Sequence, residues 1–147
     1  MKCGKRVNIC AVILGLAGVF QILIPLVIFP VCQKQIETAA GGTVPMKCHW
    51  YAMAVVILGG ALILQALLKL WVKQPETSAY GGAVTLLTGV ATMLLHNNSI
   101  IGLCANARMA CRMATLPAVN ILAGITIVVS LTEIVLNLRD IKHKNQN

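Results

Sequence analysis

Four of the six cysteines flank two short connections between apolar runs, where thiols could form disulfides, exchange them or bind a metal. Four cysteines allow three pairings: one closes each connection on itself, and the other two join the connections. We expect a joining pairing, because Cys48 and Cys111 stand at matching positions before their apolar runs. The cysteines concerned are Cys32, Cys48, Cys104 and Cys111.

Two of these cysteines lie in a repeated Met-x-Cys-basic motif, MKCHW at 46–50 and MACRM at 109–113. Thioether, thiolate and imidazole ligands together suit copper or zinc. The chain has no CxxC or HxxxH spacing, so we expect disulfides and packing methionines here, with no metal and no cofactor. The motif residues beside the cysteines are Met46, Lys47, His49, Trp50, Met109 and Arg112.

A redox enzyme is the alternative interpretation of the same cysteines. One cysteine pair in each external connection of four helices resembles the plan of disulfide-bond-forming protein B and vitamin K epoxide reductase. That resemblance implies thiol–disulfide exchange linked to a quinone, with His49 or Arg112 favouring a neighbouring thiolate. Those families use a CxxC pair, which this sequence does not contain.

The elements that position these cysteines are four long apolar runs, at 9–30, 50–72, 81–104 and 116–138. Of the 147 residues, 58% are hydrophobic and 11% charged, and the mean hydropathy is +0.83. About 20 apolar residues suffice for a helix to cross a bilayer core of about 30 Å. The sequence therefore predicts an all-α integral membrane protein, a single four-helix bundle over 1–147. We expect the first run to be retained, because it is too long for a signal peptide and no small-x-small cleavage site follows.

The basic residues predict the orientation of this bundle. Eight of the 12 Lys and Arg residues fall on the side that holds both termini, and four on the other side. The positive-inside rule then places both termini in the cytoplasm and the chain in the cell (inner) membrane. The net charge of +8 follows from this bias, and no basic stripe with interleaved aromatics indicates nucleic-acid binding.

The repeated motif extends into an internal duplication. After a one-residue slip, ILGG at 57–60 aligns with ILAG at 121–124, which predicts two parallel helix-hairpin repeats. At this offset Lys69 corresponds to Glu133, and we expect an intramembrane ion pair, because an acid in a bilayer is costly unless paired. Small and weakly polar residues follow helical spacing on the third and fourth runs and predict packing faces, with a polar pathway through the bundle as the alternative. They are Thr85, Thr88, Gly89 and Thr92, and Ala123, Thr126, Ser130, Glu133 and Asn137.

The chain as a whole resembles the bacterial and archaeal family catalogued as domain of unknown function 4418. The resemblance covers nearly all of the sequence and rests on KCHW at 47–50, MACR at 109–112 and LP at 116–117. It brings no established activity, and it implies an accessory subunit beside permeases of the ABC type.

We therefore expect a non-enzymatic accessory or scaffold protein of the membrane, with an external cap stapled by disulfides. Its partners would be the lipid bilayer and an ABC-type permease or further copies of itself. A thiol–disulfide oxidoreductase is the alternative, followed by copper or zinc binding.

Overall fold

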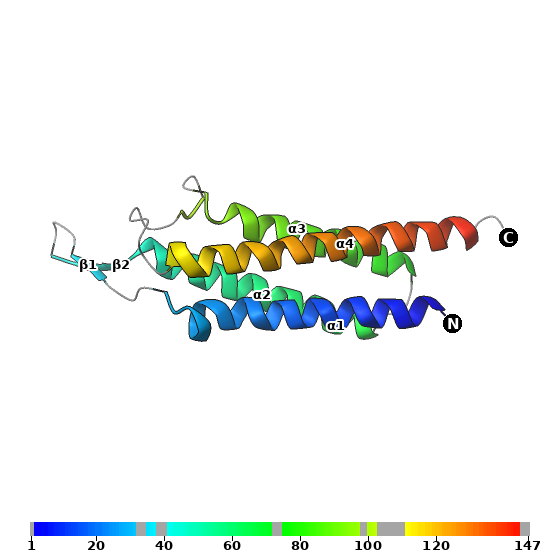
Figure 1. The fold of residues 1–147 in the computed structure, drawn as a ribbon. Helices are drawn as coiled ribbons and strands as arrows, with labels where there is room; N and C mark the ends of the chain where they lie inside the picture. The colour runs from blue at the N-terminus through cyan, green and yellow to red at the C-terminus, as the bar shows by residue number, and fades with distance from the viewer. Residues whose placement is uncertain are drawn as a thin grey trace.

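A computed structural model describes residues 2–31, 35–37, 41–71, 75–97, 100–102 and 111–144. Within them the chain forms four helices side by side along one axis, with a small sheet at the end away from both termini (Figure 1). In chain order the elements are α1 (Lys2–Leu23), the π-helical turn η1 (Ile24–Ile28), β1 (Gln35–Glu37), β2 (Thr43–Pro45), α2 (Lys47–Trp71), α3 (Pro75–Leu94), the π-helical turn η2 (Cys111–Thr115) and α4 (Leu116–Lys144).

The predicted helical architecture is confirmed, with one addition in the first connection. Strands β1 and β2 pair in antiparallel register, with Gln35 opposite Pro45 and Glu37 opposite Thr43. Gly41, before β2, has a φ of 77°, which glycine adopts without the steric cost that a Cβ brings. Strands of three residues give too short an alternating pattern to be recognised in sequence.

Three segments are long and apolar enough to cross a membrane: Asn8–Ile28, Lys47–Trp71 and Cys111–Arg139. The third predicted helix, 81–104, is wrong at both ends, because α3 begins at Pro75 and ends at Leu94. Its apolar part, Ala79–Leu94, is shorter than the other three. The helix stops just before Asn97, a residue type that favours turns, and the Asn97 N–H donates to Leu94 O at 3.0 Å.

Helix α1 widens into η1 where Pro25 enters it. Proline has no N–H, so the regular hydrogen bond to the preceding turn cannot form. The Phe29 N–H instead donates to Ile24 O at 2.8 Å, a five-residue spacing that opens the helix by one residue. Thr115, in η2, donates its hydroxyl to Phe29 O at 3.1 Å and so ties this turn to the start of the last helix.

The helices pack most closely as two hairpins, α1 with α2 and α3 with α4. A methyl group at Gly18 would lie 2.8 Å from Gly59 O and 2.9 Å from Ile63 Cγ1, so only glycine permits this crossing. In the second hairpin Gly89 faces Ala123 and Ile127 in the same way. Small residues let helix backbones approach closely, which is how helices associate where lipid offers no hydrophobic drive.

Candidate functional site

The interior of the bundle is lined with polar side chains from all four helices, and we call this set the polar column. The stripes predicted on the third and fourth apolar runs contribute most of it, and they face inward. The buried polar and charged residues are Gln21, Lys69, Thr85, Thr88, Thr92, Thr115, Thr126, Ser130, Glu133 and Asn137.

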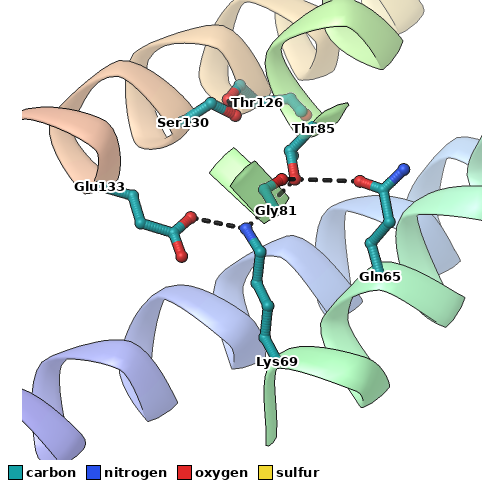
Figure 2. Close-up of polar contacts among 7 residues, drawn as sticks. All are labelled: Gln65, Lys69, Gly81, Thr85, Thr126, Ser130 and Glu133. Atoms are coloured by element: carbon teal, nitrogen blue, oxygen red, sulfur yellow. Dashed lines mark hydrogen bonds and ion pairs between the residues drawn. The ribbon is translucent and has the colours of Figure 1, made fainter. Parts of the chain in front are cut away.

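An ion pair between α2 and α4 (Figure 2) lies in the part of this column nearest the two termini. Lys69 Nζ is 2.6 Å from Glu133 Oε2, and the side chains are only 5% and 3% exposed. Lys69, in the last turn of α2, also donates to Thr85 Oγ1 of α3 at 3.1 Å. Gly81 leaves room for the lysine, because a methyl group there would lie 3.2 Å from Lys69 Cε. The two opposite charges therefore satisfy each other in the interior of the bundle.

Hydrogen bonds continue from this pair toward the sheet end of the bundle. The Thr85 hydroxyl has Gln65 Oε1 at 2.9 Å and Gly81 O at 2.7 Å as acceptors, and Gln65 Nε2 donates to Thr88 Oγ1 at 3.3 Å. One turn further on, the Thr92 hydroxyl donates to Thr88 O at 2.9 Å. Side-chain hydrogen bonds thus link α2 to α3, and the threonine hydroxyls also donate to two backbone carbonyls within α3.

The last member of this chain is Gln21 of α1. Its Nε2 donates to Thr92 Oγ1 at 3.2 Å, and the side chain is fully buried. Neither Gln21 nor Gln65 was predicted as a site residue. The available signal was an amide within an apolar run, since a buried amide requires hydrogen-bond partners.

On α4 the hydroxyl groups of the column are satisfied within their own helix. Thr126 donates to Leu122 O at 2.9 Å, and Ser130 donates to Thr126 O at 2.7 Å. Such bonds to the carbonyl four residues earlier leave a hydroxyl needing no partner from another helix. Thr126 and Ser130 therefore line the column near the ion pair (Figure 2) but, within the described part of the chain, make no side-chain hydrogen bond to another helix that would connect α4 to its neighbours.

At the sheet end, one cysteine from each half meets the other. Cys48 and Cys111 are both fully buried, and their Sγ atoms are 3.2 Å apart, whereas sulfurs bonded to each other lie about 2.05 Å apart. The predicted disulfide residues Cys32 and Cys104 lie outside the described residues. The structure therefore brings together two of the four cysteines predicted to form disulfides, without a bond between their sulfurs.

The remaining motif residues lie around this pair, mostly at the surface. Lys47, Trp50 and Arg112 are exposed, and Met46 and His49 are half-buried. The rings of His49 and Trp50 meet edge to face, with centroids 5.9 Å apart. Met109 falls outside the described residues. Among the residues that the structure describes, no three His, Cys, Asp or Glu side chains are grouped as metal ligands.

These side-chain contacts join neighbouring helices to one another. The ionised groups neutralise each other, and the cysteine sulfurs are enclosed by protein. The family described as a domain of unknown function, DUF4418, matches the chain over residues 1–136, as the sequence motifs predicted. No curated protein and no solved structure matches the chain.

Proposed function

The chain belongs to the family of the domain of unknown function DUF4418, and from this premise we propose that it is a non-enzymatic accessory subunit of the cell membrane. The observation that supports this role most directly is the enclosed Lys69–Glu133 pair. A buried charge that serves transport or catalysis must be reached by its substrate, whereas this pair is enclosed and bonded to Thr85. The Lys69–Glu133 pair would instead hold α2 and α4 in one arrangement.

We infer that the bundle spans the bilayer with both termini in the cytoplasm. Two exposed tryptophans on α2, Trp50 and Trp71, support this placement. They lie about 32 Å apart along the helix at 1.5 Å per residue, close to the thickness of a hydrocarbon core. Tryptophan side chains favour the two membrane interfaces, and the excess of Lys and Arg at the termini favours the cytoplasmic side.

We also infer that the two hairpins arose by duplication and are related by a two-fold axis along the bundle. A residue that lies on such an axis meets its own equivalent from the other half. The contacts between the hairpins fit this rule at the sheet end, in the middle and near the termini. The axial pairs are Cys48 with Cys111, Gln21 with Thr92, and Lys69 with Glu133.

The proposed partner is an ABC-type permease, as the family resemblance implies. The outer faces of the helices carry large apolar side chains, including Ile57 on α2 and Val128 on α4, which could pack against another membrane protein. A photo-crosslinking residue placed at position 57 or 128 should bond in native membranes to a permease that mass spectrometry identifies. Crosslinks only between copies of this chain would support a homo-oligomer and contradict the permease assignment.

We propose that disulfides among Cys32, Cys48, Cys104 and Cys111 staple the external cap. The contact between Cys48 and Cys111 shows that the two connections meet, but these two sulfurs are not bonded to each other, so peptide mapping has to identify the pairs. In a maleimide titration across a graded redox buffer, a structural disulfide should stay protected until the potential falls below about −300 mV. The alternative, a thiol–disulfide oxidoreductase, requires one pair to open at about −180 to −120 mV, as catalytic disulfides do.

The label in this titration is assigned to each cysteine by peptide mapping. A sample unfolded in detergent under reducing conditions is the control, because all six cysteines should then react. Opening of any external pair in the catalytic range would overturn the scaffold role and lead directly to a quinone reduction assay.

A further inference from the structure

Helix α3 ends before it reaches the sheet end of the bundle, where α2 and the η2–α4 segment begin. Its apolar part, Ala79–Leu94, is about 24 Å long at 1.5 Å per residue, against a hydrocarbon core of about 30 Å. Gly89 packs between the levels of Ala123 and Ile127, so Leu94 lies level with about position 120 of the antiparallel α4. Helical structure on the α4 side begins at Cys111, about 14 Å further out.

Non-helical chain occupies this corner of the bundle. Leu95 and Ile101 pack against the buried cluster that includes Tyr51 and Val119, and the Gly102 N–H donates to Leu95 O at 3.4 Å. His96, Asn97 and Ile100, in the same segment, are exposed. Irregular backbone within a membrane is tolerated only where protein or water satisfies its polar groups.

Polar atoms without a partner gather at this end of the column. In the described part of the chain, the buried side-chain atoms without a hydrogen-bond partner are Gln21 Oε1, Tyr51 OH and Asn120 Oδ1. Gln21 is held at the last turn of α3 by its bond to Thr92, and Asn120 lies level with Leu94. At the level where four helices are present, Gln65, Lys69, Thr85 and Thr88 all have partners.

The contact with Thr92 fixes the orientation of the Gln21 side-chain amide. The Thr92 hydroxyl donates its proton to Thr88 O, so Thr92 Oγ1 must accept from Gln21. The amide nitrogen is therefore the group that faces Thr92, and the oxygen is left as an acceptor in a fully buried side chain. A buried acceptor without a donor is costly, typically by about 1–3 kcal/mol.

We propose that the outer end of α3 is a hydrated binding site that takes small neutral hydrogen-bond donors, such as water and primary amides, from the external side. The Gln21 oxygen is a buried acceptor without a donor, so a ligand that satisfies it carries an N–H or O–H group. The exposed Lys47 and Arg112 at this end of the bundle oppose a cationic ligand. The inference rests on the proposed membrane placement.

Thiol accessibility tests the site. We would introduce Asn120→Cys, Ile121→Cys and Ser130→Cys separately into the full chain and treat vesicles with a membrane-impermeant maleimide from the external side. Thiols react as thiolates, which form in water and not in lipid. Asn120→Cys should label at least tenfold faster than Ile121→Cys, which faces lipid, and faster than Ser130→Cys, which lies deeper in the column.

Each result has a separate meaning for the two proposals. Equal, slow labelling at 120 and 121 would overturn the hydrated site and leave the membrane placement standing. Fast labelling at Ile121→Cys would instead contradict the membrane placement, because that position is 65% exposed and would then face water. In hydroxyl-radical footprinting of the unsubstituted chain, which keeps Asn120, excess acetamide should lower the oxidation of Leu95 relative to Leu86 at least twofold. No change, or the same decrease with methylammonium instead, would overturn the ligand class.

The unsubstituted chain provides a second measurement in case Asn120→Cys does not fold. Hydroxyl-radical footprinting in lipid nanodiscs oxidises side chains that contact water. Leu86 and Leu95 are both half-buried leucines, the first within α3 and the second just past its end. Leu95 should be oxidised several times faster than Leu86, and equal rates would contradict a hydrated site.

Discussion

Glu133→Ala is expected to lower the free energy of unfolding by about 3–5 kcal/mol. The substitution leaves the Lys69 ammonium group 5% exposed, with Thr85 as its remaining hydrogen-bond acceptor in the column. An unpaired buried charge loses hydration that nothing replaces, which is the main part of this cost. The measurement is reversible unfolding in mixed micelles, followed by circular dichroism.

Two further variants separate the ion pair from loss of packing. Lys69→Met combined with Glu133→Leu removes both charges with little change in volume and should restore most of the stability, because well-packed apolar pairs often replace buried ion pairs at no cost. Thr132→Ala is the matched control, since Thr132 is exposed and bonds only to Val128 O of its own helix. A loss under about 1 kcal/mol for Glu133→Ala would show that the pair does not hold the bundle together.

Gly59→Ala is expected to destabilise the protein by about 1–3 kcal/mol, as overpacking of a close contact does. The added methyl group would lie 2.8 Å from Ile22 Cγ1 and 3.0 Å from Gly18 O. The side chain of Ile22 can rotate away, but the carbonyl of Gly18 can move only if α1 moves with it. The first hairpin therefore has to separate at its closest point.

Gly60→Ala, one residue further along α2, is the matched control. A methyl group at Gly60 meets nothing within 4 Å, and alanine favours the helix over glycine by about 0.8–1 kcal/mol. The two variants should thus change stability in opposite directions, as measured by unfolding in the same micelles. Equal effects at 59 and 60 would mean that the crossing of α1 and α2 is not tightly packed.

Hydrophobic length and internal similarity were sufficient to predict much of this architecture from the sequence. The four apolar runs predicted the four helices, because a run of about 20 apolar residues has the length and composition of a membrane-spanning helix. The slipped repeat placed Lys69 and Glu133 at equivalent positions, and the structure brings these two side chains within 2.6 Å. The short motifs at 47–50 and 109–112 were sufficient to identify the family.

Only the tertiary structure decided where α3 ends and what Gln21 and Gln65 bind. Leu95 and Ile101 are as apolar as the helix before them, so composition does not distinguish a continued helix from irregular chain packed on the core cluster. The partners of the two amides lie on other helices, and the rotation of each helix about its axis sets which residues meet. The end of α3 and the unpartnered Gln21 oxygen depend on contacts between segments that are distant in the sequence. The hydrophobic length of a run, in contrast, is a local property that the sequence shows directly.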